Sequence, residues 1–218
     1  EGGAIVSDDE GFMDRCYSHH NYGNPYGSVA GEVGAGTLRI GTKLRLAEYQ
    51  AAIGLAQLER LEEQTETRNK NASYLKARIG EVPGITPYRL NDGVTRAAFH
   101  LFPFLYDQEQ FNGMPRAKFL EALRAEGVPC SSGYGELNKM PFIKNAFNSR
   151  FFKKFYPEDR LDYDKYIAEN SCPRNEKLSK ELAVWFSQNI LLGSREDMDN
   201  IAFAIEKIKN NTEKIRAK

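Results

Sequence analysis

Side chains with the potential for chemistry gather first in a loop near the start of the chain. His20, Asn21 and Tyr22 stand together there, and a glycine-rich stretch follows them as far as Gly41. An imidazole beside amide and phenol groups can move protons or hold a ligand, and a hydrogen-bonded loop histidine is the ordinary alternative. Loops of this length inside compact domains tend to be functional or disordered, and the embedded polar side chains favour function.

Four residues elsewhere could also serve a site, and three of them have a plainer interpretation. Lys43 is either an anion ligand or a solvated loop cation, and Arg45 is expected to pair with a carboxylate such as Glu48. His100 lies in an apolar run, where a hydrogen-bonded core histidine is the commoner outcome. Tyr134, which stands between two glycines, is predicted to line a pocket.

No single motif in the sequence names a reaction. The sequence has no Ser/His/Asp order, no cluster of metal ligands and no Walker glycine loop. Cys16, Cys130 and Cys172 are odd in number and widely spread, so neither a disulfide framework nor a zinc site is indicated. We therefore predict three structural thiols and no metal site.

The composition predicts a soluble globular protein. The 218 residues are 41% hydrophobic and 28% charged, which is enough to bury a core. A formal net charge of zero and a pI near 7.1 give no support for binding nucleic acid or an anionic membrane surface. No stretch approaches the roughly twenty apolar residues of a membrane helix, and residues 1–9 lack the basic start of a signal peptide. The chain is expected to be cytoplasmic.

The elements that must position these side chains follow from periodicity and turn residues. Residues 3–7 have strand character, and residues 7–10 supply capping side chains for a short helix that runs to about Ser18. Residues 46–79 contain no proline and one glycine, and their apolar stripe predicts one long helix. Pro83-Gly84 then marks a turn.

A small sheet and a helix are predicted next. Residues 85–90 and 97–106 are strand-like and should pair with each other. Met114-Pro115 opens a helix, and Gly127 stands where a left-handed cap would close it.

The last third of the chain is predicted to be irregular at first and regular at its end. Residues 129–170 are expected to be irregular, and residues 182–192 to form a buried extended run around the single tryptophan. Residues 194–197 resemble a capping box that opens a terminal helix. The whole pattern predicts the remnant of an α/β domain with a long connecting helix in residues 1–82, and a small α+β domain in residues 83–218.

Several segments carry a family resemblance when they are taken in order. They are Glu1-Gly2-Gly3-Ala4-Ile5-Val6, His20-Asn21-Tyr22-Gly23, RLAEYQAAIGLAQL at 45–58, Phe99-His100-Leu101-Phe102, Gly127-Val128, Gly133-Tyr134, Cys172-Pro173 and QNILLG at 188–193. With comparable spacing, they resemble the DegT/StrS family of sugar aminotransferases over essentially the whole chain.

This resemblance implies a fold type I enzyme that depends on pyridoxal 5'-phosphate and forms a homodimer with its active sites at the subunit interface. It implies that the Schiff-base lysine precedes Glu1 and is absent from this chain. It places the segment with Lys43 and Arg45 at the cofactor, where the family usually carries Asn in place of Lys43 and that side chain reaches the phosphate of the neighbouring subunit. It assigns four residues on three segments to the substrate: His20, Asn21, His100 and Tyr134.

Departures from the family bear on the substrate and the reaction. Tyr134-Gly135-Glu136-Leu137-Asn138 stands where Tyr-Pro-Pro-Leu-His is common, and residues 142–166 look nearer to the scyllo-inosose or aminocyclitol branch. The implied reaction moves an amino group from an amino acid such as glutamine or glutamate to a keto-sugar or keto-cyclitol. A dehydratase with histidine in place of the Schiff-base lysine, and a non-catalytic dimerising fragment, are the alternatives.

Overall fold

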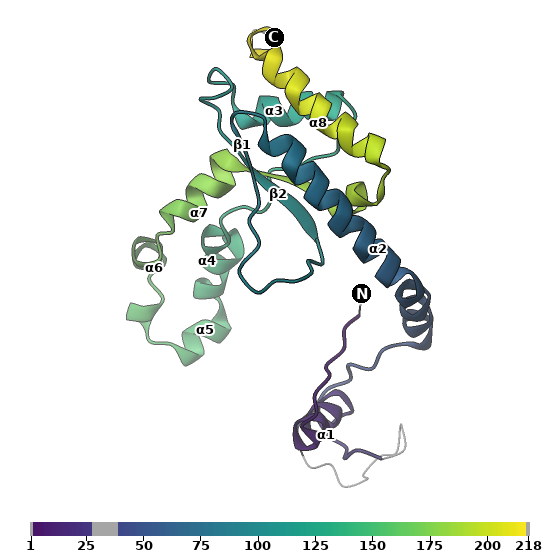
Figure 1. The fold of residues 1–218 in the computed structure, drawn as a ribbon. Helices are drawn as coiled ribbons and strands as arrows, with labels where there is room; N and C mark the ends of the chain where they lie inside the picture. The colour runs from purple at the N-terminus through teal and green to yellow at the C-terminus, as the bar shows by residue number, and fades with distance from the viewer. Residues whose placement is uncertain (1, 28–38, 217–218) are drawn as a thin grey trace. The chain divides into compact units, whose positions relative to one another are not determined.

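The computed structural model of the chain describes residues 2–27 and 39–216. Its contacts divide the chain into two compact units, Glu1–Glu62 and Glu63–Lys218, and each is described by itself. The division falls inside helix α2 (Glu48–Gly80), the 33-residue helix drawn in Figure 1. The domain boundary expected after residue 82 stays a prediction. No helix in the described part of the chain is long and apolar enough to cross a membrane.

The first unit contains helix α1 (Glu10–His20), close to where the sequence predicts it. A side-chain oxygen of Asp9 accepts a hydrogen bond from the Phe12 amide at 2.9 Å and caps the first turn. The strand predicted over residues 3–7 is wrong, because these residues are exposed and have no strand assignment. No strand of the described residues pairs with them, and an isolated extended segment in water has no ladder to join.

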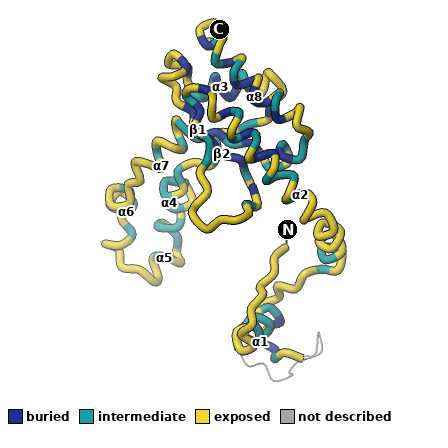
Figure 2. The backbone as a smooth tube through the Cα atoms, viewed as in Figure 1, coloured by how far each residue is buried: buried dark blue, intermediate teal, exposed yellow. Residues whose placement is uncertain are grey.

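Helix α2 confirms the long helix predicted over residues 46–79. Its apolar stripe, however, meets two environments, as the change from exposed to buried along α2 shows in Figure 2. Leu75 and Ile79 are fully buried in the second unit, whereas Leu58 and Leu61 are more than half exposed. The stripe therefore forms core only in the later turns of the helix.

The second unit is built on a three-stranded antiparallel sheet. The strand order is β1 (Ile85–Pro87), β2 (Leu101–Tyr106) and β3 (Ala183–Ser187). The two runs predicted at 85–90 and 97–106 do pair, over shorter lengths than the sequence suggested.

Alternation along the strands gives this sheet two different faces. Phe102, Phe104 and Tyr106 of β2 are buried together with Phe186 of β3, and they belong to the hydrophobic core. Helices α2, α3 (Arg116–Ala125) and α8 (Arg195–Asn210) contribute further side chains to that core and cover this face in Figure 1. The residues between them, among which Pro103 pairs with Trp185, face the opposite way.

The predicted helix ends are largely confirmed. Ser194 and Asp197 form a complete capping box at the start of α8, and α9 (Thr212–Arg216) follows it. Gly127 has a φ of +83° just after α3, the left-handed conformation that glycine adopts without steric cost.

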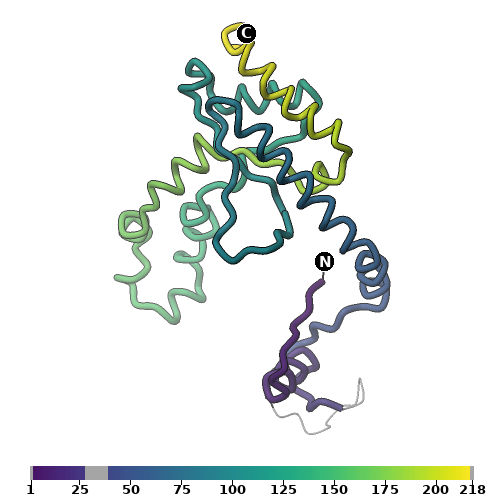
Figure 3. Tube along the Cα trace, viewed as in Figure 1, coloured from purple at the N-terminus to yellow at the C-terminus, as the bar shows by residue number. Residues whose placement is uncertain are grey.

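The prediction of an irregular stretch over residues 129–170 is wrong. Figure 3 shows residues 137–182 winding as a run of short helices. They are the 3₁₀ turn Leu137–Lys139, α4 (Pro141–Asn148), α5 (Arg150–Phe155), the 3₁₀ turn Glu158–Arg160, α6 (Tyr163–Glu169) and α7 (Pro173–Lys177), which continues as a π-helical turn, Leu178–Leu182. Ser149 and Asp162 cap α5 and α6 with their side chains, so local capping rather than a long apolar period defines these helices.

The extended run predicted over residues 182–192 is strand in its first half alone. Strand β3 ends at Ser187, and Gln188–Leu192 form a 3₁₀ turn. The buried side chain of Asn71 donates its amide hydrogens to the carbonyls of Leu191 and Gly193, at 2.9 and 2.8 Å. A polar residue of α2 thus redirects the chain from the sheet toward α8.

Candidate functional site

His20 ends helix α1 and is half buried in the first unit. Its Nδ1 lies 2.6 Å from the Tyr17 carbonyl oxygen, and the two rings meet edge to face at 5.1 Å. A carbonyl oxygen can only accept, so Nδ1 must carry the hydrogen and donate it. In the neutral imidazole this leaves Nε2 as an acceptor for a hydroxyl or ammonium group.

Asn21 follows directly and is almost completely buried, at 3% exposure. Its backbone forms an isolated antiparallel bridge with Lys43. Its side-chain Nδ2 is buried and has no hydrogen-bond partner among the described residues. A buried amide donor with unused capacity is uncommon in proteins and marks a place where a ligand oxygen could be bound.

Backbone hydrogen bonds hold the two ends of the glycine-rich loop together. The Thr42 amide donates to the His19 carbonyl at 2.7 Å, and the Leu44 amide donates to the His20 carbonyl at 3.1 Å. A Cβ atom on Gly41 would lie 2.4 Å from the Gly23 nitrogen, so glycine is required for this close approach. Three glycines of the glycine-rich stretch noted in the sequence, Gly31, Gly34 and Gly36, lie outside the described residues.

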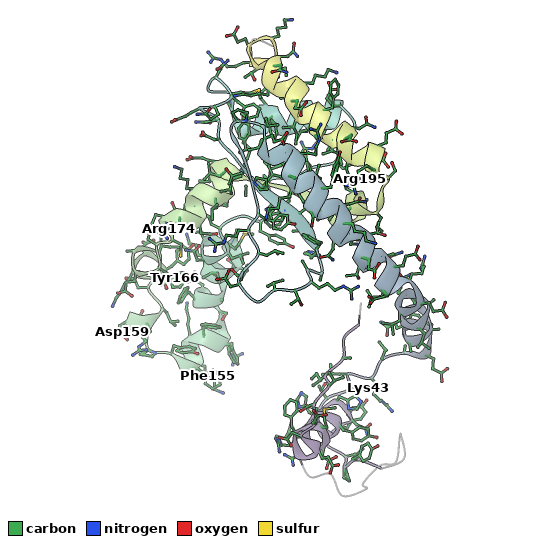
Figure 4. All side chains as sticks on the ribbon, in the orientation of Figure 1. Lys43, Phe155, Asp159, Tyr166, Arg174 and Arg195 are labelled. Carbon is green, nitrogen blue, oxygen red and sulfur yellow. The ribbon has the colours of Figure 1, made fainter. Side chains whose placement is uncertain are left out.

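Lys43 and Arg45 are exposed, and Figure 4 labels Lys43 in the first unit. Neither forms an ion pair with any residue that the structure describes. The pair of Arg45 with Glu48 that the sequence suggested is therefore not formed. A different side chain contacts the backbone at the start of α2: Gln50 Oε1 accepts a hydrogen bond from the Ala47 amide at 3.0 Å. An exposed ion pair would add little stability at this position.

The second unit contains a cavity of about 800 Å³ against the open face of its sheet. Pro103, Leu105 and Trp185 line it from the sheet, Tyr134 lines it from the segment after α3, and Leu178 from the helical run. This volume lies within the range of small-molecule sites, and apolar and aromatic side chains predominate in the lining.

Tyr134, predicted to line a pocket, does so. Its ring meets Trp185 edge to face at a centroid distance of 4.9 Å, and its side chain is 64% exposed at the cavity. Gly133 has a φ of +80°, and a Cβ atom there would lie 2.5 Å from the Trp185 ring. Glycine thus lets the chain pass directly over the tryptophan and sets the place of the next side chain.

A sequence profile of the DegT/DnrJ/EryC1/StrS aminotransferase family matches residues 1–154, well over half of the chain. The chain belongs to this family. The resemblance drawn from its segments is therefore confirmed.

Curated relatives match this chain along nearly its whole length. An L-glutamine:2-deoxy-scyllo-inosose aminotransferase from Streptoalloteichus tenebrarius is 29% identical, and the match covers 100% of this chain and 51% of the relative. An L-glutamine:scyllo-inosose aminotransferase from Streptomyces griseus is 28% identical, with 99% and 51% covered. The chain thus spans about half the length of the curated relatives it matches.

Solved structures share the fold of this chain. The crystal structure of 3-amino-5-hydroxybenzoic acid synthase matches with a TM-score of 0.67 at 20% identity, over 92% of this chain and 47% of that one. Helicobacter pylori PseC, an aminotransferase of pseudoaminic acid biosynthesis, matches with a TM-score of 0.65 at 20% identity, over 94% and 48%. The expected fold type I architecture is confirmed.

His100 does not lie in the core, as the sequence suggested, but is exposed immediately before β2. The preceding residue, Phe99, is buried and has a φ of +49°, a conformation that a non-glycine residue rarely adopts. This breaks the strand alternation that would have turned His100 to the same face as Phe102. Its role at the substrate, expected from the family, stays a prediction.

The structure brings together His20, Asn21 and Lys43 in the first unit, and Tyr134 with Trp185 in the second.

We did not identify from the sequence a cluster of charged side chains that lies near Tyr134. Glu136, Lys139, Glu176 and Lys180 form one cluster of ion pairs. The sequence could have indicated two of these pairs, because Glu136 and Lys139 are three residues apart and Glu176 and Lys180 are four apart. The pairing between the two segments depends on the fold.

Proposed function

We propose that the protein containing this chain transfers an amino group from an amino acid to a keto-cyclitol or keto-sugar, with pyridoxal 5'-phosphate as its cofactor. Membership of an aminotransferase family supports the reaction class. The relatives described above are named for L-glutamine as donor and scyllo-inosose compounds as acceptors, which supports glutamine and a keto-cyclitol as the pair.

The main structural support for this proposal is the group of residues at the end of α1 and around Lys43. Lys43 and Arg45 are exposed cations without ion-pair partners among the described residues, and the bridge to Asn21 places an unused buried donor beside Lys43. Cations and N–H donors are the groups that bind a phosphate. The residues present therefore fit the phosphate of the cofactor, with Lys43 as a point charge and Arg45 capable of bidentate contact.

The chemistry can be divided between the cofactor and this chain. When bound, pyridoxal 5'-phosphate supplies an electron sink for the carbon that exchanges its amino group. Lys43 and Arg45 would hold its phosphate, and His20 Nε2 would accept a hydrogen bond from a substrate hydroxyl, because its Nδ1 is already used by Tyr17. The lysine that anchors the cofactor covalently is proposed to lie outside residues 1–218.

We also propose a homodimer and a cytoplasmic location. The exposed apolar residues Ile53, Leu55, Leu58 and Leu61 on the early turns of α2 support an interface, since exposed apolar groups of this kind mark association surfaces. Free Cys16, Cys130 and Cys172 suit a reducing compartment, where thiols stay unpaired.

The phosphate role is tested by binding of pyridoxamine 5'-phosphate, which has the phosphate but no aldehyde, to the full-length protein. Lys43→Gln should weaken binding by about tenfold, because one charge-assisted contact of about 1.5 kcal/mol is lost. The difference should shrink at high salt. Lys70→Gln is the matched control, since Lys70 is an exposed helical lysine paired only with the exposed Glu66 among the described residues. Equal affinities for the two variants would contradict the role of Lys43.

A further inference from the structure

The segment that carries Tyr134 crosses the open face of the sheet and is fixed at its beginning. Ser131 and Trp185 exchange two backbone hydrogen bonds, at 3.0 and 2.9 Å. Gly133 then passes over the tryptophan ring, and the Tyr134 ring packs against it in an edge-to-face arrangement. These contacts fix the beginning of the segment beside the cavity.

Glu136 holds the far end of this segment, two residues beyond Tyr134. Its side chain is 10% exposed, and its carboxylate oxygens each lie 2.8 Å from an ammonium group, one of Lys139 and one of Lys180. Lys139 also pairs with Glu176, and Glu176 lies 3.9 Å from Lys180. The four charges alternate in sign and cancel, so each charged group has a partner of opposite sign.

The ion pairs shift the pKa values of Glu136 and Lys139. Lys139 and then Lys180 hold the pKa of Glu136 below its ordinary value, against the opposing effect of desolvation. Glu136 and Glu176 raise the pKa of Lys139. Both groups are therefore charged throughout the neutral range.

Lys180 is itself held in place by the body of the second unit. The Arg116 guanidinium, at the start of α3, donates to the carbonyls of Ser179, Lys180 and Ala183 at 2.7 to 2.9 Å. These carbonyls lie at the C-terminal end of the α7 helical run, where a cation is favoured. The contacts therefore form a continuous path from α3 through Lys180 to Glu136.

We propose that Glu136 is a positioning residue that holds Tyr134 at the mouth of the cavity by anchoring its segment to Lys139 and Lys180. The proposal rests on the proposed function in one respect, that Tyr134 contacts the acceptor. Glu136 acts through Tyr134 and does not itself touch the acceptor. An ordinary surface ion pair would have no such effect, because exposed pairs contribute little and their loss is local.

Trp185 is the single tryptophan of this chain and lies against Tyr134, so its fluorescence reports on this contact. In the 218-residue chain, Glu136→Gln should shift the Trp185 emission and increase its quenching by acrylamide, because the segment over the ring is released. Glu169→Gln is the matched control, since it removes the same charge from an exposed pair with Lys165 in α6. Lys180→Gln should reproduce the change, and the double variant should add little to either one.

In the full-length enzyme, Glu136→Gln should raise KM for the acceptor by about tenfold, within the roughly hundredfold that a 1 Å misplacement can cause. The half-reaction with the amino donor should be unchanged. Unaltered Trp185 fluorescence in both Glu136→Gln and Lys180→Gln would overturn the proposal, as would equal losses in both half-reactions. If the unmodified enzyme does not aminate a keto-cyclitol, the proposed function fails, and the fluorescence comparison still decides whether Glu136 positions Tyr134.

Discussion

The two units of the chain are stabilised in different ways. In the second unit, buried aromatic and aliphatic side chains from the sheet, α2, α3 and α8 form a hydrophobic core. The described residues of the first unit contribute no member to that core, and their buried side chains are polar, Ser18, Asn21 and Asn24. Backbone hydrogen bonds join the end of α1 to residues 42–44 instead.

The first unit carries both the possible ligand-binding residues and exposed apolar side chains. The unit without an apolar core presents Lys43, Arg45 and an unused Asn21 donor, together with exposed Leu58 and Leu61. Net stability comes mainly from apolar burial, so a segment that leaves its apolar groups exposed gains stability from whatever covers them. The second unit has its own core and can position Tyr134 without such a partner.

The largest effect should come from removing a core ring of the second unit. Phe186 is fully buried between strands and helices, so Phe186→Ala should lower the free energy of unfolding of the chain by about 3–5 kcal/mol. Leu58→Ala removes an exposed side chain and should change it by less than about 0.5 kcal/mol. Urea unfolding followed by circular dichroism measures both.

In the full-length protein, the same two variants test whether another part of the protein covers the early turns of α2. If the early turns of α2 are covered there, Leu58→Ala should become destabilising by about 2 kcal/mol or more, as for a buried leucine. A destabilisation by Leu58→Ala in the isolated chain as large as that by Phe186→Ala would contradict the difference between the units.

A smaller effect is expected at the glycine beneath Tyr134. Gly133→Ala puts a Cβ atom 2.5 Å from the Trp185 ring at a φ of +80°, whereas Gly93→Ala has nearly the same φ, +84°, with open space around it. Both should cost about 1 kcal/mol for the left-handed backbone. Gly133→Ala should cost a further 1–3 kcal/mol from overpacking and alter Trp185 fluorescence. Equal melting temperatures for the two variants would show that the segment does not press on the tryptophan.

Much of the fold could be predicted from local signals. The capping box at Ser194, the left-handed Gly127 and the long period of α2 all depend on neighbouring residues, and all are present. The short helices between residues 137 and 182 could not be predicted, because each has fewer than three turns. Side-chain caps on α5 and α6, and aromatic contacts such as that of Phe147 with Tyr166, stabilise some of them. The strand expected at residues 3–7 failed for a related reason, since a strand depends on its partner.

The candidate site also has some features that the sequence indicated and others that depend on the fold. The family resemblance and local motifs pointed to His20, Asn21, Lys43, Arg45, His100 and Tyr134. The exposure of His100 depends on the unusual backbone of Phe99, which no pattern in the sequence indicated. The contact of Glu136 with Lys180 joins segments far apart in the chain, and only the folded second unit brings them together.

The most direct test of the proposed function follows the amino group itself. Full-length protein with pyridoxal 5'-phosphate would be given glutamine labelled with ¹⁵N at its α-amino group, together with a keto-cyclitol such as scyllo-inosose, and the products analysed by mass spectrometry. The proposed function predicts ¹⁵N in an aminocyclitol, formed in proportion to the glutamine consumed. An unaminated cyclitol, or label that stays in glutamine or appears as free ammonia, would contradict it.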